Sequence, residues 1–267
     1  MFSMIKNINN TMHVVGISSV VVAEKGLRAT CMDYVSDVLP ELIAQHDIAV
    51  ESIDLILTLS TSIDYLSEHK DIQTPRLGYP VQKQLAANNA FVIDLQDTSW
   101  AQAFEVANGY LSGTDMSNVL VIEANSFEKN IVEQLFTGAR AALLSKSNTV
   151  NQVHMVVNTL GEGEPRTLSH VESNLLLSDS NENEVAMLQK TIETIMEQFR
   201  SSTKPLLLDL PPYLSTNVQS ELQTKYPDKC WWTWDTLREN PENVVWLSYE
   251  VFRNRVVARE VFVKGDL

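Results

Sequence analysis

Three short apolar runs, at residues 53–59, 91–95 and 118–122, constrain the fold of this 267-residue chain more than any other feature. Runs of this length and composition are typical of strands that are buried on both faces of a parallel sheet. Residues 98–111 lie between the second and third runs and repeat apolar side chains at helical spacing. This alternation of strand and helix predicts an α/β fold with a mostly parallel sheet.

The order of the predicted elements divides the chain into two halves. The first half covers residues 12–160. The second, shorter half covers residues 161–267, opens with a polar linker at 161–182, and repeats the order of helix, strand, helix and two strands. We therefore expect two pseudo-repeated αβ halves, with central sheets and helices packed in layers.

Two further expectations concern the ends of the first half. Residues 1–11 are predicted to form an irregular extension before a β-branched strand at 13–22. Residues 139–144 and 152–158 are predicted to be two strands that form an antiparallel pair and close the half.

Composition excludes several classes of function. The net charge is −14, with 34 acidic and 20 basic residues, so nucleic acid and anionic membranes are poor partners. Only Cys31 and Cys230 are present, without zinc spacing, and the five histidines are scattered, so we expect no disulfide framework, no metal and no cofactor. The first ten residues lack the apolar run of a signal peptide, which favours a cytoplasmic location.

Several segments together resemble the ketosynthase III branch of the thiolase superfamily. They are ESIDLIL, HKDIQTPRLGYPVQKQLAANNAFVIDL and the DTS turn after it, VLVIEA, LFTGARAALL and VVWLSYEVF. The likeness is strongest over residues 51–125, and within the branch it is to the PqsB-type, non-catalytic subunits of heterodimeric 2-alkyl-4-quinolone synthases. The resemblance implies a thiolase-like fold.

The residues that the family's chemistry requires are missing. In the family a cysteine at the start of the helix after the strand carries the acyl group, because the helix N-terminus lowers its pKa. Here that nucleophile position falls on Asp97, Thr98 or Ser99, and none is a cysteine. No histidine follows His170, and the turn that is glycine-rich in the family is replaced by residues 250–253. We therefore expect no catalytic residue in this chain.

Simpler roles compete with catalysis for the remaining candidates. Ser99-x-x-Gln102 fits a capping box, which we favour over a catalytic serine. Cys230 follows Lys229, which can activate a thiol, but it precedes Trp231, Trp232 and Trp234, so we favour burial or half-burial of the thiol beside aromatic rings. Two alternatives stay open: an independently active acyltransferase that uses Ser99 or Cys230, and a homodimeric ligand-binding relic.

The resemblance implies a catalytically inactive subunit that pairs with an active ketosynthase III-like subunit. The complex, a heterodimer or a dimer of heterodimers, would transfer and condense acyl groups in alkylquinolone-like secondary-metabolite biosynthesis, with acyl-CoA or an acyl carrier reaching it through the partner. The expected interface residues are Thr74, Pro75, Arg76, Tyr79, Phe91, Val92, Ile93 and Trp100.

Overall fold

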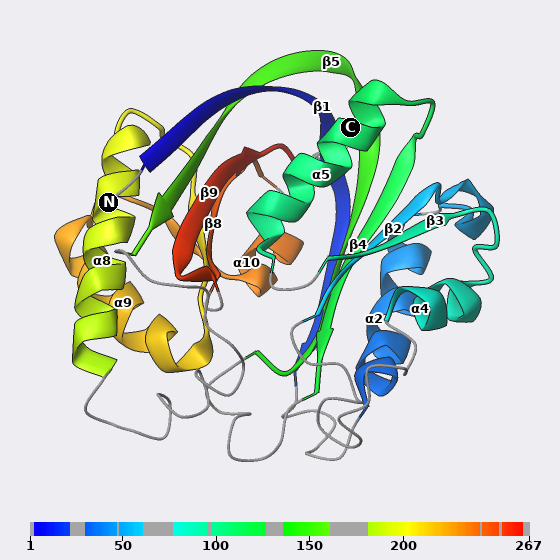
Figure 1. Cartoon of the computed structure of the whole chain (residues 1–267), viewed down its shortest axis with the longest axis horizontal. Helices are drawn as coiled ribbons and strands as arrows, with labels where there is room; N and C mark the ends of the chain where they lie inside the picture. The colour runs from blue at the N-terminus through cyan, green and yellow to red at the C-terminus, as the bar shows by residue number, and fades with distance from the viewer. Residues whose placement is uncertain are drawn as a thin grey trace.

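The computed structural model describes residues 3–21, 30–46, 48–60, 77–95, 98–126, 136–160, 181–240, 242–250 and 253–263. Within these ranges the chain forms one nine-stranded sheet that curls around a central helix (Figure 1). The strands are β1 Ser3–Val21, β2 Leu55–Leu59, β3 Phe91–Leu95, β4 Asn118–Asn125, β5 Gly138–Thr159, β6 Leu206–Asp209, β7 Trp231–Trp232, β8 Val244–Glu250 and β9 Arg255–Val261. The helices are α2 Cys31–His46, the short 3-10 helix η1 Val50–Ser52, α4 Gly78–Leu85, α5 Trp100–Gly113, α8 Asn181–Gln198, α9 Pro212–Lys225 and α10 Trp234–Glu239.

The sheet has parallel strands toward both ends and antiparallel strands in the middle. Its order is β3-β2-β4-β5-β9-β8-β6-β7, with β1 paired to β5 outside this path. β2 pairs in parallel with β3 and β4, and β6 pairs in parallel with β7 and β8. The apolar runs of each half thus form the parallel strands that they predict. β5 and β9 pair antiparallel to each other and join the two groups.

Helices and sheet alternate in layers, as Figure 1 shows. α2 and α4 cover one face of the first-half strands, where Tyr34, Val35 and Leu39 are buried. α5 lies between the two arms of the curled sheet and shares one core with strands of both halves. α8 and α9 cover the outer face of the second-half strands. Pro40 lies inside α2 without ending it.

β5 differs from its prediction. Residues 139–144 and 152–158 do not pair with each other; they belong to one long strand whose partner along nearly its whole length is β1. The segment before Met12 is likewise no irregular extension, since Ser3 lies opposite Asn158 in the ladder. Met4 and Ile5 are exposed and Ile8 is only partly buried, so these residues form no regular buried stripe. Backbone pairing with β5 therefore supplies a structure that the residue pattern does not indicate.

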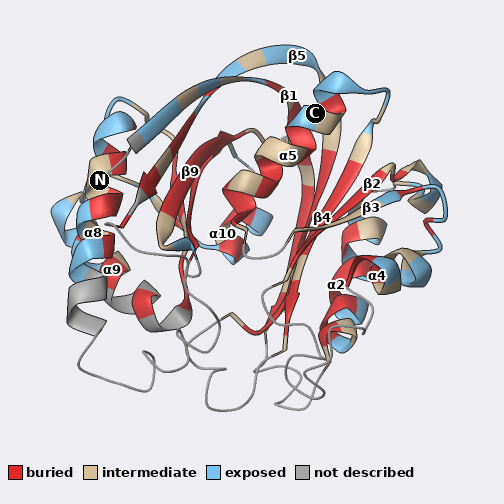
Figure 2. Ribbon diagram, viewed as in Figure 1, coloured by how far each residue is buried: buried red, intermediate tan, exposed pale blue. Residues whose placement is uncertain are grey.

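β3 is an edge strand, although the sequence predicts that it is buried on both faces. Among the strands that the structure describes it pairs with β2 alone, and Phe91 is 67% exposed. Figure 2 shows β4 largely buried, whereas β3 is largely intermediate. The apolar run reflects partial burial of Ile93 and Leu95 against the core around α5. The predicted linker at 161–182 lies almost wholly outside the described residues.

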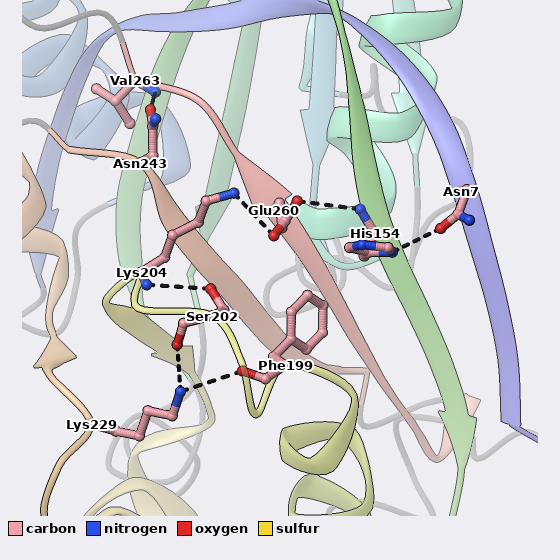
Figure 3. Close-up of polar contacts among 9 residues, drawn as sticks. All are labelled: Asn7, His154, Phe199, Ser202, Lys204, Lys229, Asn243, Glu260 and Val263. Atoms are coloured by element: carbon pink, nitrogen blue, oxygen red, sulfur yellow. Dashed lines mark hydrogen bonds and ion pairs between the residues drawn. The ribbon is translucent and has the colours of Figure 1, made fainter.

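Polar contacts tie the two halves together beside the β5–β9 ladder (Figure 3). The His154 ring on β5 is hydrogen-bonded to Asn7 of β1 through Nδ1, at 2.8 Å, and its backbone N–H donates to Glu260 of β9 at 3.4 Å. Glu260 also pairs with Lys204, which precedes β6, at 3.0 Å. No described helix is long and apolar enough to cross a bilayer.

Candidate functional site

Ser99 forms the N-cap of α5. Its hydroxyl accepts a hydrogen bond from the backbone N–H of Gln102 at 3.1 Å, and its carbonyl accepts the first helical bond, from Ala103, at 2.9 Å. The predicted capping role is confirmed. The second half of the predicted box is wrong, because the Gln102 side chain donates to Glu105 at 2.8 Å instead of returning to the Ser99 amide.

The Ser99 amide is bound by Glu250 from the other half of the chain. Glu250 ends β8, and its Oε1 accepts the Ser99 N–H at 2.9 Å. The Glu250 side chain is only 1% exposed, so this is a buried carboxylate at the positive end of a helix. Glu250 stands where the resemblance implies the first residue of a glycine-rich turn.

Two arginines contact the Glu250 carboxylate. Arg255 lies directly opposite Glu250 in the β8–β9 ladder, and its Nε donates to Glu250 Oε2. Arg253 lies 3.9 Å from the same oxygen. A buried carboxylate is costly unless it is paired and hydrogen-bonded, and here both conditions are met. Two further residues were candidates for the nucleophile position. Asp97 lies outside the described residues, and Thr98 is half-buried.

A second polar cluster lies beside the first turn of α5. The indole N–H of Trp100 donates to Glu123 at the end of β4, at 2.7 Å, and the Asn125 amide donates to the other Glu123 oxygen at 3.1 Å. Arg140 of β5 lies opposite Glu123 in the ladder and 3.8 Å from its carboxylate. Arg140 also donates to Asp209 at the end of β6, so it connects strands of the two halves.

Glu123 has an unusual titration. Burial raises the pKa of Glu123 from 4.5 to about 7, and the neighbouring Asp209 carboxylate acts in the same direction, whereas Arg140 and the hydrogen bonds from Trp100 and Asn125 oppose the rise. One guanidinium thus contacts two carboxylates, and the loss of solvation on burial keeps Glu123 partly protonated near neutral pH. Such a cluster is either a functional site or a structural ion-pair network.

Aromatic rings fill the space between these clusters and the second half. Trp100 packs on Trp234 and Trp246 with ring centroids 4.9 and 5.7 Å apart, and Phe104 packs on Trp246 at 5.1 Å. Trp234 is buried, which confirms the packing interpretation for this tryptophan. Trp100 is buried in the same core, so it offers no surface to a partner, and its place among the expected interface residues is wrong.

The Lys229–Cys230 pair has no activating geometry. The Lys229 ammonium donates to the backbone carbonyls of Phe199 at 3.3 Å and of Ser202 at 2.6 Å, and it caps the end of α8 (Figure 3). Cys230 is exposed, so its expected burial is wrong. Its sulfur accepts a hydrogen bond from the neighbouring Trp232 indole at 3.1 Å. The lysine is therefore engaged in packing α8 rather than in activating the thiol.

The expected interface residues fall into three groups. Thr74, Pro75 and Arg76 lie outside the described residues. Tyr79 on α4 is 64% exposed and, with Phe91, presents aromatic surface near the open edge of β3. The remaining β3 members, Val92 and Ile93, are half-buried. Among the described residues no group of three histidine, cysteine or acidic side chains is placed to hold a metal ion.

No local pattern in the sequence indicates the cluster formed by Glu123, Arg140 and Asp209. These residues are widely separated in the chain, and each is one charged residue next to an apolar strand. Two of the three share a feature that could have pointed to a site, because Glu123 and Asp209 lie at the carboxyl ends of β4 and β6. In α/β sheets functional side chains gather at such strand ends.

Comparison with known proteins places this geometry in a known fold. No family model matches the chain. It is 42% identical over 86 residues to the 2-heptyl-4(1H)-quinolone synthase subunit PqsB of Pseudomonas aeruginosa, which confirms the resemblance inferred from the sequence. The aligned segment covers 32% of this chain and 30% of that subunit, so the match spans less than a third of the relative.

Solved structures match over almost the whole chain. A 3-oxoacyl-(acyl-carrier protein) synthase of Burkholderia xenovorans LB400 has a TM-score of 0.68 at 10% identity, with 97% of this chain and 96% of that one covered. OleA of Xanthomonas campestris has a TM-score of 0.64 at 12% identity, with 95% and 98% covered. The predicted thiolase-type fold is therefore confirmed.

Proposed function

We propose that this chain is a non-catalytic, ketosynthase III-like subunit that pairs with an active ketosynthase III-like subunit in alkylquinolone-type biosynthesis. The thiolase-type fold and the partial identity to PqsB support the family assignment. The observation that carries the proposal is the Glu250–Ser99 hydrogen bond, because a buried carboxylate fills the end of α5 where an acyl-carrying cysteine would need the helix dipole.

The rival view, an independently active acyltransferase, has little support in the contacts. The Ser99 hydroxyl serves as a helix cap, and Glu250, bound to the Ser99 amide, is engaged by Arg255. Cys230 has a tryptophan N–H beside its sulfur and a lysine neighbour that is bonded elsewhere. Within the described part of the chain, neither Ser99 Oγ nor Cys230 Sγ is hydrogen-bonded to a histidine or carboxylate that could act as a general base.

The open edge of β3 is the surface that we propose for the partner. An unpaired strand edge exposes a row of N–H and C=O groups that another chain can extend, and exposed aromatic residues are enriched at the centres of interfaces. Tyr79 and Phe91 provide such residues beside the edge. A strand of the partner added here would bury both rings.

Co-expression tests the pairing. The chain is produced with a tagged ketosynthase III-like protein that retains its cysteine and histidine, and we expect the two to co-purify in a fixed ratio. Condensing activity of that partner with a fatty acyl-CoA is then measured with and without the chain. A partner that purifies alone and is fully active without the chain contradicts the proposal.

Two aspartate variants locate the interface. Phe91→Asp and Tyr79→Asp place a charge on the proposed surface, and we expect each to reduce the recovered complex by tenfold or more, since an unpaired charge is costly to bury in an interface. Val150→Asp is the matched control, because Val150 is 63% exposed but lies on β5, away from β3. Equal loss of complex in all three variants would place the interface elsewhere.

A further inference from the structure

The start of α5 is a place of positive electrostatic potential. The first backbone N–H groups of a helix have no partner within it, and the dipoles of the helix add to a partial positive charge at this end. α5 has 14 residues, long enough for the dipole to develop. A thiol placed here would have a lowered pKa, and a developing oxyanion would be stabilised.

An anion of the chain itself already lies at this position. Glu250 binds the Ser99 amide through one carboxylate oxygen and Arg255 through the other. Because Glu250 and Arg255 are opposite each other in the β8–β9 ladder, the sheet fixes the carboxylate in place. The side chain is almost completely excluded from solvent, so water screens its charge poorly.

We propose that Glu250 is a built-in anion that holds the N-terminal end of α5 electrostatically closed, so that this end neither activates a nucleophile nor accepts an anionic ligand. The contact is autoinhibitory and fixed in the fold. Its biological meaning, that a subunit without acyl chemistry keeps its former acyl site shut, rests on the proposed function. The electrostatic effect of Glu250 on the N-terminal end of α5 does not depend on the proposed function.

A reporter thiol measures this effect directly. Ser99→Cys places a sulfur at the helix cap, and Cys230→Ser removes the exposed native thiol, while the buried Cys31 stays constant in all variants. The pKa of the new thiol is read from the thiolate absorbance near 240 nm as the pH is raised. A free cysteine titrates near pH 8.5, and helix N-termini lower this to about 3.5–7.5.

We expect a thiol pKa at or above about 8.5 while Glu250 is present. Adding Glu250→Gln, which keeps the shape and the acceptor oxygen but removes the charge, should lower the thiol pKa by about one unit or more. Near-ultraviolet circular dichroism checks that each variant is folded.

A second arm works in the opposite direction and covers the case in which Glu250→Gln does not fold. Arg255→Gln leaves the Glu250 charge less compensated, so the thiol pKa should rise above that of the parent. Glu260→Gln is the matched control, because Glu260 is also a buried glutamate with a basic partner, Lys204, but binds the His154 amide rather than a helix end.

The outcomes separate cleanly. A fall with Glu250→Gln, or a rise with Arg255→Gln where the Glu250→Gln variant does not fold, together with no change with Glu260→Gln, supports the closed helix end. Equal thiol pKa values in the parent and the Glu250→Gln variant, or an equal shift with Glu260→Gln, overturn it. A failure to co-purify with a partner would overturn the proposed function and leave these titrations unchanged.

Discussion

The indole nitrogen of Trp100 lies 2.7 Å from the carboxylate of Glu123 and donates a hydrogen bond to it, which fastens the first turn of α5 to the end of β4. Glu250 holds the preceding residue, Ser99, from β8. The start of α5 is therefore fixed by carboxylates from both halves of the chain. A helix held in this way has little freedom to open a pocket at its N-terminus.

Glu123 should make stability depend on pH near neutrality. Its folded pKa, about 7, is raised above the unfolded value of 4.5, so the folded state keeps the proton longer. The free energy of unfolding should therefore fall as the pH rises from about 4.5 to 7. The fall should be at most about 3 kcal/mol, which is the full value of the pKa difference, because solvent reaches the 18% of the side chain that is exposed and weakens the effect. Urea unfolding at pH 5.5, 6.5, 7.5 and 8.5 measures the slope.

Replacing this carboxylate isolates its contribution. Glu123→Gln should flatten the slope between pH 5.5 and 7.5, because the amide does not titrate. The control is Glu197→Gln, which changes a glutamate whose side chain is 55% exposed on α8 and should leave the slope as it is. A stability difference between wild type and Glu123→Gln that stays constant with pH would refute the assignment.

The Ser99 hydroxyl should contribute stability as a helix cap. Ser99→Ala removes the acceptor for the Gln102 amide and should lower the free energy of unfolding by about 1 kcal/mol. Ser99→Thr keeps the hydroxyl and should recover most of the loss. Both are compared by urea unfolding, and equal stability of wild type and Ser99→Ala would contradict the capping role.

Gly78 should tolerate no side chain. A Cβ atom there would lie 2.2 Å from Val92 Cγ1 and 3.0 Å from Asp94 Oδ1, and the Gly78 amide itself donates to Asp94 at 3.0 Å. Gly78→Ala should therefore cost about 1–3 kcal/mol. Gly109→Ala is the matched control, because nothing lies near its Cβ in α5, and it should stabilise by about 0.5–1 kcal/mol. Thermal unfolding measures both, and a neutral Gly78→Ala would contradict the packing.

The two cysteines should differ in access and neither should carry an acyl group. Cys230 is exposed and should react with a thiol reagent in the folded protein, whereas Cys31 is buried and should react only in denaturant. Incubation with acyl-CoA should leave the intact mass unchanged. An adduct that disappears with Cys230→Ser or Ser99→Ala would favour the acyltransferase alternative instead.

The spacing of apolar residues along the sequence predicts those helices and strands that bury one or both of their faces. The helix of residues 98–111 and the parallel strands were found because their residues face a core with a regular period. The strand before Met12 was missed because its stabilisation comes from backbone pairing with β5, which leaves no such period. The edge position of β3 was missed because the order of strands in a sheet is a long-range property.

In the candidate site, too, the local contact could be predicted from the sequence and the long-range contact could not. The helix cap at Ser99 is a local interaction between residues three apart, and the sequence predicted it. The partner of the Ser99 amide was predicted wrongly as Gln102, because Glu250 comes from 151 residues away. Charged residues beside strands have no local pattern that distinguishes a buried pair from a solvated one.

β5 belongs to both halves of the fold, since it pairs with β1 and β4 on the first side and with β9 on the second. A fragment cut after residue 160 would therefore expose a long row of backbone groups where β9 belongs, and an open edge of this kind invites aggregation. Neither half can therefore be isolated by truncation without breaking pairs that β5 forms with the other half.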